Sequence, residues 1–262
     1  MNGILGKILA KKRIETEAEM LAVPAAEVER AALAAPKPPS FRDALAPSGG
    51  IPAVIAELKK ASPSMGLIRA DFRPEELAPA LESAGASALS VLTEREFFMG
   101  GPECLSQAAS LVKIPVLRKD FIYCEYQLLQ ARALGASAAL LIAAMLKKTE
   151  LERLARFAKS LGLDALVETH TEGELECALE CGAEIIGVNS RNLKTFVFDF
   201  SLFESLLSKI PEGARAVAES GMETREALER AAECGAHAAL VGTALMSAKN
   251  PAKKLERMLG GK

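Results

Sequence analysis

The chain has no excess of charge of either sign, and this absence excludes several classes of partner. Its formal net charge is −2 over 262 residues, and its one run of three basic residues is Lys11–Arg13. Proteins whose main partner is nucleic acid or an anionic membrane normally carry a clear basic excess. The composition therefore favours a small-molecule partner, and we expect neither nucleic acid nor membrane as a partner.

A long apolar segment is also missing. The longest uncharged, apolar-rich run covers residues 133–146 and is shorter than the ~20 residues that a membrane-spanning helix needs. Near the N-terminus, basic residues flank a short apolar stretch without a cleavage site, so we predict no signal peptide. We expect a soluble, cytoplasmic protein.

Cysteine and histidine are scarce. The five cysteines are an odd number and lack the spacing of a zinc ribbon, and the chain has only two histidines. This usage argues against a disulfide framework and against a structural metal. We interpret the cysteines as small, buried apolar side chains.

The sequence does contain a weak internal repeat, in which a helical stretch is followed by a glycine and then by an apolar run. The repeated glycines are Gly85, Gly135, Gly182 and Gly235, at intervals of 50, 47 and 53 residues. A glycine at this place is typical of a helix C-terminal cap, and the apolar run after it is typical of a buried strand. Four helix–glycine–strand units are therefore predicted.

Four further apolar segments complete a set of eight predicted strands. They are Ile51–Leu58, Ile114–Leu117, Asp164–Val167 and Arg215–Ala218. Strands that alternate with helices imply right-handed parallel crossovers, and eight such units in about 210 residues match a closed (β/α)8 TIM barrel of the α/β class. An open, doubly wound sheet is the alternative. Such a sheet would usually carry a Gly-rich dinucleotide-binding loop after its first strand, and the first strand here runs into Lys59–Ser64 instead.

The first 50 residues differ in character from the rest. Apolar residues near the start have helical spacing, Pro24 interrupts the pattern, residues 25–35 can form a second helix, and Pro36–Pro39 ends it. We expect residues 1–50 to form an N-terminal helical extension packed on a catalytic (β/α)8 barrel of residues 51–262.

Charged residues gather where the odd-numbered strands are predicted to end. The first strand ends at Glu57 and Lys59, and the third, fifth and seventh strands end at Lys119, Glu168 and Glu219. Because side chains alternate along a strand, these residues share the register that points into the barrel, at the edge where such barrels have their active sites. Taken alone, Glu57 and Lys59 could equally form a solvated ion pair. For the whole set, the favoured interpretation is an acid and a base that tune each other's pKa.

Small and polar residues follow the last three strands. Ser220 with Gly221, and Gly242 with Thr243, come after the seventh and eighth strands, where backbone N–H groups form the usual phosphate cradle of these barrels. After the sixth strand, Asn189 and Arg191 offer an amide and a cation that can orient oxygen atoms.

Five motifs together resemble the indole-3-glycerol phosphate synthase family, in order and in spacing. They are Ile55–Ser64, Leu117–Ile122, Leu166–His170, Gly187–Leu193 and Ala218–Gly221. The resemblance covers nearly the whole chain and implies a barrel carboxy-lyase of tryptophan biosynthesis. Its substrate would be 1-(2-carboxyphenylamino)-1-deoxyribulose 5-phosphate, whose pyrrole ring is closed with release of carbon dioxide and water. No cofactor and no metal are implied, and we expect a monomer or a weak homodimer.

The resemblance also implies roles for matching positions. Lys119 would be the main general acid, Glu168 the general base, and Lys59 would hold the substrate carboxylate. The whole implied catalytic set is Lys119, Glu168, Lys59, Glu57, Asn189, Arg191 and Glu219. The implied substrate-binding residues surround the phosphate or wall the aromatic ring, and they are Ser62, Pro63, Phe98, Phe121, Leu140, Leu193, Ser220, Gly221, Gly242 and Thr243.

Two alternatives remain open. Another phosphate-binding barrel enzyme, such as an isomerase of aminoaldose phosphates, would share the phosphate cradle without requiring Lys59, Lys119 and Glu168 together. A non-catalytic barrel that only binds sugar phosphates would have no turnover that depends on these residues.

His170 follows Glu168 by two residues, but the resemblance gives it no role, and we interpret it as a hydrogen-bonded structural histidine. Met65 stands where the family often has a basic residue, which leaves the contacts of that loop open.

Overall fold

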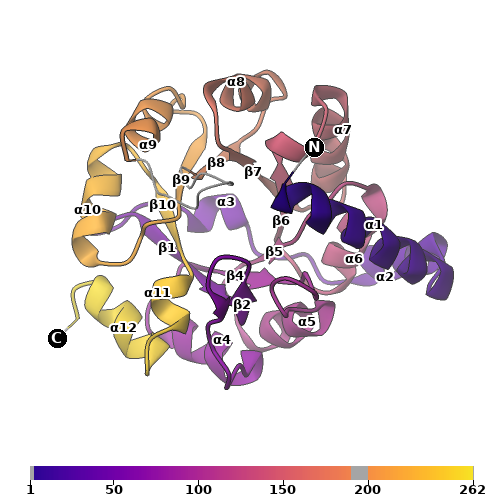
Figure 1. Ribbon diagram of the computed structural model, residues 1–262, viewed down its shortest axis with the longest axis horizontal. Helices are drawn as coiled ribbons and strands as arrows, with labels where there is room; N and C mark the ends of the chain where they lie inside the picture. The colour runs from indigo at the N-terminus through magenta and orange to yellow at the C-terminus, as the bar shows by residue number, and fades with distance from the viewer. Residues whose placement is uncertain (1–2, 190–199, 262) are drawn as a thin grey trace.

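Parallel strands close into a barrel, as predicted, and not into an open sheet (Figure 1). The structure is a computed structural model that describes residues 3–189 and 200–261. Neighbouring strands are parallel all the way round, in the order β1-β10-β9-β8-β7-β6-β5-β4, and β4 pairs back with β1. The barrel strands are β1 (Ala53–Leu58), β4 (Ala88–Leu92), β5 (Val116–Lys119), β6 (Ala138–Ile142), β7 (Asp164–Thr169), β8 (Ile185–Asn189), β9 (Arg215–Glu219) and β10 (Ala238–Val241).

Helices alternate with the strands and surround the barrel (Figure 1). All four predicted cap glycines have positive φ, between 72° and 98°, which is the left-handed conformation that ends a helix at glycine. The outer helices are α4 (Pro74–Ser83), α5 (Pro102–Leu111), α6 (Glu125–Ala133), α7 (Lys148–Ser160), α8 (Glu172–Glu180), α9 (Phe200–Leu207), α10 (Arg225–Glu233) and α12 (Pro251–Met258). Shorter elements are the strands β2 (Ala61–Ser62) and β3 (Gly66–Leu67), the 3-10 helix η1 (Ala143–Met145) and α11 (Thr243–Met246).

Two strands begin later than predicted, and proline explains the difference. β1 begins after Pro52 and β5 begins after Pro115, in each case two residues beyond the predicted start. Proline has no N–H to donate to the strand ladder, so regular pairing begins at the next residue. β5 also extends to Lys119, which pairs with Leu92 of β4.

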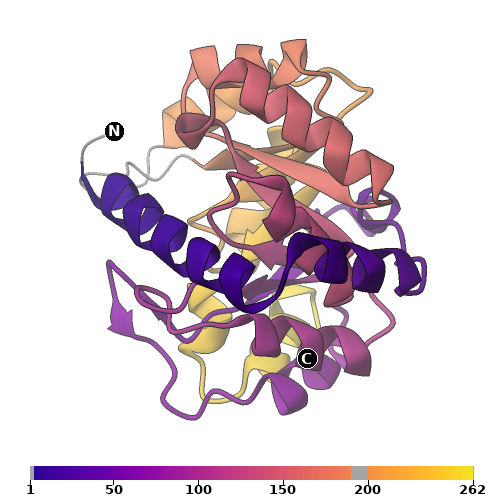
Figure 2. The same ribbon diagram turned by 90° about the vertical axis from the view of Figure 1, so that its right-hand side faces the viewer.

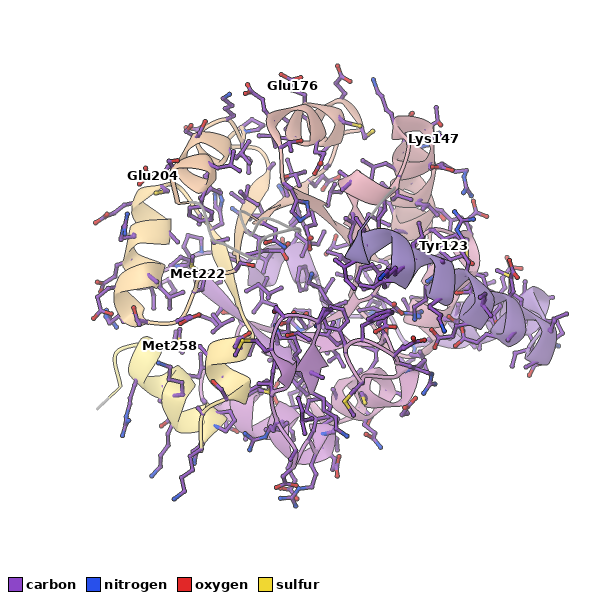
Figure 3. The ribbon with its side chains drawn as sticks, viewed as in Figure 1. Tyr123, Lys147, Glu176, Glu204, Met222 and Met258 are labelled. Atoms are coloured by element: carbon purple, nitrogen blue, oxygen red, sulfur yellow. The ribbon has the colours of Figure 1, made fainter. Side chains whose placement is uncertain are left out.

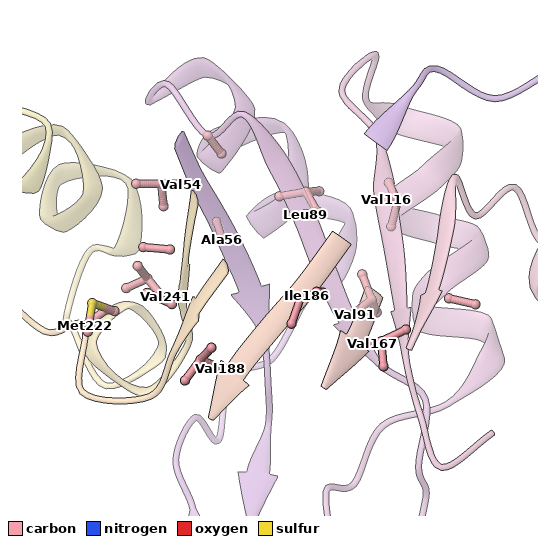
Figure 4. Close-up of a cluster of buried hydrophobic side chains, with 14 of the residues drawn as sticks. Val54, Ala56, Leu89, Val91, Val116, Val167, Ile186, Val188, Met222 and Val241 are labelled. Carbon is pink, nitrogen blue, oxygen red and sulfur yellow. The ribbon is translucent and has the colours of Figure 1, made fainter. Parts of the chain in front are cut away.

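Each strand is buried on both faces. Residues such as Val54, Ala56 and Val91 face the helices and form the larger apolar cluster, which Figure 4 shows between the strands and the outer layer. Alternate residues, among them Ile55 and Leu117, form a second apolar cluster inside the barrel. The register therefore directs the next alternate residues, at the carboxyl ends of the strands, into the mouth of the barrel.

The N-terminal segment contacts both ends of the barrel. The long helix α1 (Ile4–Ala22) runs across one side of the molecule and leads through Pro24 into α2 (Ala25–Ala34) (Figure 2). Ile8 of α1 belongs to the apolar cluster inside the barrel, and α2 packs on α6. A short helix that the sequence did not predict, α3 (Phe41–Ala44), lies at the opposite end.

Helix α3 closes the end of the barrel at which the strands begin. Phe41 and Leu45 are fully buried in the interior cluster. The backbone N–H of Arg42 donates to the carboxylate of Asp164, the first residue of β7 (2.9 Å). The division into an extension of residues 1–50 and a barrel of residues 51–262 stays a proposal.

Of the helices in the described part of the chain, none combines the length and the apolar character needed to cross a membrane.

Candidate active site

A cavity of about 310 Å³ opens where the barrel strands end, and we call it the barrel-mouth cavity. The structure places in its lining every predicted site residue that it describes. These are Glu57, Lys59, Ser62, Pro63, Phe98, Lys119, Phe121, Leu140, Glu168, Asn189, Glu219, Ser220, Gly221, Gly242 and Thr243. The two other predicted residues, Arg191 and Leu193, lie outside the described residues.

Lys119, the last residue of β5, is the central cation of the cavity. Its Nζ lies 2.8 Å from Oε2 of Glu168 and 3.4 Å from Oε2 of Glu219, and its side chain is 14% exposed. Burial alone would lower the pKa of Lys119, but the surrounding carboxylates outweigh it and raise the pKa above its ordinary value. The ammonium is therefore charged at neutral pH and can donate a proton or a hydrogen bond.

Glu168 ends the inward-facing register of β7 and is held on both of its oxygens. Oε2 accepts a hydrogen bond from Lys119, and Oε1 accepts one from Nδ2 of Asn189 at 3.2 Å. Asn189 in turn accepts a hydrogen bond from the Ser220 hydroxyl at 2.9 Å. Burial would raise the pKa of Glu168, but Lys119 and His170 outweigh it and hold the pKa well below its ordinary value.

Glu219 differs from Glu168 although both carboxylates face the same ammonium. Burial, only partly offset by Lys119 and reinforced by the negative charges of Glu168 and Glu57, raises the pKa of Glu219 to about 8. At neutral pH this carboxyl group is therefore mostly protonated. Its Oε1 makes no hydrogen bond within the described part of the chain.

Glu57 and Lys59 form a buried ion pair, not the solvated pair that was the alternative for them. Lys59 Nζ lies 2.7 Å from Oε2 of Glu57, and the side chains are 15% and 4% exposed. Two glycines give the carboxylates room: a Cβ on Gly242 would stand 2.1 Å from Glu57 Oε2, and one on Gly187 would stand 2.1 Å from Glu219 Oε1. A larger residue at either position would therefore displace the carboxylate group from its present place.

A turn with unusual backbone geometry follows β9. Ser220 and Gly221 both have positive φ, 67° and 72°, and Ser220 is one of two non-glycine residues in this conformation in the part of the chain that the structure describes. Such backbone strain concentrates at functional sites.

Figure 3 shows the inner and outer sides of the ring of helices. Met222 is buried and lies on the inner side, whereas the exposed Lys147 and Glu176 lie on the outer rim of the ring.

Aromatic and aliphatic side chains form the apolar part of the cavity wall. The rings of Phe98 and Phe121 lie 5.9 Å apart between centroids, at an angle of 41°. The buried carboxylate of Glu94 holds the Phe98 loop by accepting hydrogen bonds from three successive backbone N–H groups, those of residues 96–98. This wall provides a surface on which a flat, apolar ring can pack.

Several cavity residues escaped the sequence prediction. Ile4, Leu5 and Ile8 of α1 line the cavity, and the helical spacing of these apolar residues was the only signal for it. His170, interpreted as a structural histidine, is not among the lining residues, but its Nε2 lies 3.2 Å from Oε1 of Glu168, a contact that the sequence did not predict.

A further buried pair ties α1 to the residue beside Lys119. Lys12 of α1 lies 3.0 Å from Oδ1 of Asp120, and Asp120 also pairs with Arg118 at 2.9 Å and accepts from the Thr93 hydroxyl. Lys12 also pairs with Glu15 on the same helix at 2.7 Å, but its contact with Asp120 could not be found in the sequence, because the two residues lie 108 positions apart along the chain.

Solved structures of low sequence identity share the fold. A thiamine phosphate pyrophosphorylase from Pyrococcus furiosus aligns with a TM-score of 0.60 at 16% identity, covering 84% of this chain and 96% of that one. An N-acetylmannosamine-6-phosphate 2-epimerase from Clostridium perfringens aligns with a TM-score of 0.62, also at 16% identity, over the same shares of the two chains. These similarities support the barrel fold and nothing more specific.

Sequence comparisons are much closer. An indole-3-glycerol phosphate synthase of Dechloromonas aromatica is 45% identical over 260 residues, which cover 98% of this chain and 99% of the relative. The enzyme of the same name from Neisseria meningitidis serogroup B is 48% identical over 250 residues, covering 95% and 96%. The family model for indole-3-glycerol phosphate synthase matches residues 5–258. The chain, with the charged barrel-mouth cavity that its sequence predicts, therefore belongs to the indole-3-glycerol phosphate synthase family.

Proposed function

We propose that the barrel-mouth cavity carries out the reaction of this family with the residues that its lining brings together. The chain is a carboxy-lyase of tryptophan biosynthesis, and its substrate is phosphorylated. In the reaction, 1-(2-carboxyphenylamino)-1-deoxyribulose 5-phosphate closes its pyrrole ring and loses carbon dioxide and water to give indole-3-glycerol phosphate. Ring closure and dehydration both need proton transfers at fixed positions.

Lys119 is the general acid in this proposal, and its place in the cavity is the main support for that role. A charged ammonium stands inside a cavity, 2.8 Å and 3.4 Å from two carboxyl groups. Such an ammonium can protonate the sugar carbonyl oxygen while the aromatic carbon attacks. The negative charge of Glu168 keeps the ammonium protonated, and no other cation lies between two carboxyl groups among the described residues that line the cavity.

Glu168 is the general base that takes a proton during dehydration. Its ionised state, favoured by Lys119, suits this role, and Asn189 holds Oε1 so that the carboxylate has a fixed direction. Lys59, oriented by Glu57, is positioned to bind the substrate carboxylate. Arg191 is assigned to the same positioning group as Asn189 on the sequence alone.

The remaining lining residues bind the two ends of the substrate. Hydroxyl and glycine residues after β1, β9 and β10 surround the phosphate, and the apolar wall packs on the anthranilate ring. The phosphate group comprises Ser62, Ser220, Gly221, Gly242 and Thr243, and the wall comprises Pro63, Phe98, Phe121, Leu140 and, from the sequence alone, Leu193. A cytoplasmic location and a monomer or weak homodimer stay predictions from the sequence.

The test is turnover of the carboxyphenylamino sugar phosphate by the parent chain and by Lys119→Met. Product formation is followed by the absorbance and fluorescence of indole, and the chain contains no tryptophan that would add to the emission. We expect Lys119→Met to lower kcat by roughly 10²- to 10⁴-fold, the scale of general acid catalysis, with little change in substrate affinity. Lys113→Met is a matched control, because Lys113 is exposed and precedes the same strand at the other end of the barrel.

The same experiment gives a different result for each alternative function. Unchanged turnover in Lys119→Met would overturn the assignment of the general acid. A folded parent chain that binds the sugar phosphate but forms no indole would favour a binding protein, and turnover of an aminoaldose phosphate instead would favour an isomerase.

A further inference from the structure

His170 lies directly behind the proposed base Glu168, on the side away from Lys119. Its Nε2 is 3.2 Å from Oε1 of Glu168, whereas Lys119 contacts Oε2. The imidazole and the Glu168 side chain are 10% and 6% exposed. Oε2 of Glu168 therefore faces Lys119 from β5, and Oε1 faces both Asn189 from β8 and His170, which follows β7.

A second carboxylate holds the imidazole from the other side. Nδ1 of His170 lies 3.4 Å from Oε2 of Glu174, and the same oxygen accepts a hydrogen bond from the backbone N–H of His170 at 2.8 Å. Glu174 lies in the first turn of α8, where its own N–H donates to the capping hydroxyl of Thr171. The short connection from β7 to α8 thus fixes both the backbone and the ring of His170.

The contacts of the His170 ring with Glu168 and Glu174 are ion pairs, and they do not have the geometry of hydrogen bonds. Neither ring nitrogen meets the angles of a hydrogen bond, although each lies within 3.4 Å of a carboxylate oxygen. Burial alone would lower the pKa of His170, but Glu168 and Glu174 outweigh it and raise the pKa to about 10. Lys119 and Glu219 face Glu168 from β5 and β9 on its other side, and η1, which also packs on β7, carries no charged side chain.

We propose that His170 is a positioning residue for the reaction: anchored by Glu174, it holds Oε1 of Glu168 and leaves Oε2 directed toward Lys119 and the substrate. This inference rests on the proposed role of Glu168 as the base. A carboxylate on a strand end can rotate about its side-chain bonds, and an error of about 1 Å in the place of a catalytic group can cost on the order of 100-fold in rate. Asn189 restrains Oε1 from β8, and His170 adds a restraint that is also charged.

The experiment compares the pH dependence of kcat/KM in four variants with the parent. His170→Leu removes both the polar ring that contacts Oε1 of Glu168 and its charge, so we expect kcat to fall roughly 10- to 100-fold with KM little changed. The acidic limb of kcat/KM, which reports ionisation of the base, should move to higher pH by about 1 to 3 units, the usual effect of one nearby opposite charge.

Two further variants separate orientation from charge. His170→Gln retains an uncharged polar side chain that can contact Oε1 of Glu168, so we expect it to recover much of kcat while its acidic limb stays shifted. Glu174→Gln retains the imidazole but weakens its anchor, and we expect an intermediate loss of kcat. His237→Gln is the control, since His237 precedes β10 at the opposite end of the barrel, where its Nδ1 accepts from the Ala216 N–H. It should keep the parent profile.

A measurement on the enzyme without substrate adds a readout independent of turnover. Imidazole NMR signals of His170 should show a charged ring from pH 6 to 9 in the parent and titration at lower pH in Glu174→Gln. A neutral His170 at pH 7, or His170→Leu with the parent's acidic limb and kcat, would overturn the inference. These results differ from a failure of the proposed function, which would appear as absence of indole formation by the parent or unchanged turnover in Lys119→Met.

Discussion

At the scale of single residues, the cavity gives different pKa values to two carboxyl groups that occupy equivalent positions in the sequence pattern. Glu168 and Glu219 end inward-facing registers, and both lie within 3.4 Å of the Lys119 ammonium. One ammonium cannot neutralise two carboxylates in a buried site, so the protons distribute unequally. Glu168, which also faces Asn189 and His170, stays ionised, and Glu219 keeps its proton to about pH 8.

The retained proton on Glu219 predicts a pH dependence of stability. The unfolded chain releases this proton near pH 4.5, whereas the folded protein holds it to about pH 8. Between these values the folded state binds more protons, so the free energy of unfolding should decrease as the pH rises from 4.5 to 8. Glutamine does not titrate, and Glu219→Gln should therefore lose less stability across this window than the parent.

Urea unfolding at a series of pH values measures this difference. Glu233→Gln, a change at an exposed position of α10, should follow the parent curve. Parallel curves for parent and Glu219→Gln would contradict the raised pKa.

At the scale of helices and strands, α1 is attached by a buried ion pair and not only by apolar contacts. Lys12 is 3% exposed and lies 3.0 Å from Asp120, whose pKa is lowered to about 2 because Arg118 and Lys12 outweigh the effect of burial. The depressed pKa contributes stability that is present above pH 3.8 and is lost as the pH falls toward 2. Lys12→Met should raise this pKa and shift acid unfolding to higher pH.

The neighbouring lysine provides a matched comparison. We expect Lys12→Met to lower the free energy of unfolding by about 1–3 kcal/mol, since Asp120 keeps Arg118 but loses one buried partner. Lys11 forms a pair with Glu96 in which both side chains are more than half exposed, so Lys11→Met should change stability by less than about 1 kcal/mol. Equal effects of the two substitutions in urea unfolding would contradict the structural role of the buried pair.

The elements differ in how well the sequence predicts them. Local signals were sufficient for the glycine-capped helices and for the strands, because a cap or an alternating register depends on neighbouring residues. The same register predicted that Lys119, Glu168 and Glu219 would meet. The contact of Lys12 with Asp120 and the contacts of His170 were missed, because the first joins residues 108 positions apart and the others depend on where α8 begins.

At the scale of the whole molecule, the N-terminal segment is built into the barrel at both ends. Phe41 and Leu45 are fully buried in the barrel interior, whereas Ile8 closes the same apolar cluster from the mouth. An extension packed only on the outside would leave the barrel core complete without it. These contacts predict that residues 1–50 and the barrel unfold together.

Phe41→Ala tests this prediction. Removing a fully buried ring should lower the free energy of unfolding of the whole chain by about 3–5 kcal/mol, with one transition seen by both circular dichroism and tyrosine fluorescence. Leu33→Ala, in the same segment but 71% exposed, should cost less than about 0.5 kcal/mol. Two separate transitions, with only the first affected by Phe41→Ala, would instead favour an independent extension.

The position of α1 across the barrel mouth has a consequence for the order of events during synthesis. Lys12 leaves the ribosome 108 residues before Asp120, and the carbonyls of Glu19 and Val23 precede Tyr126, whose hydroxyl donates to them, by more than 100 residues. At about 5–20 residues per second, α1 waits roughly 5 to 20 seconds for its partners. During that time Ile4, Leu5 and Ile8, which line the cavity in the folded protein, are open to solvent and to chaperones, so part of the cavity wall is exposed before its partners are made.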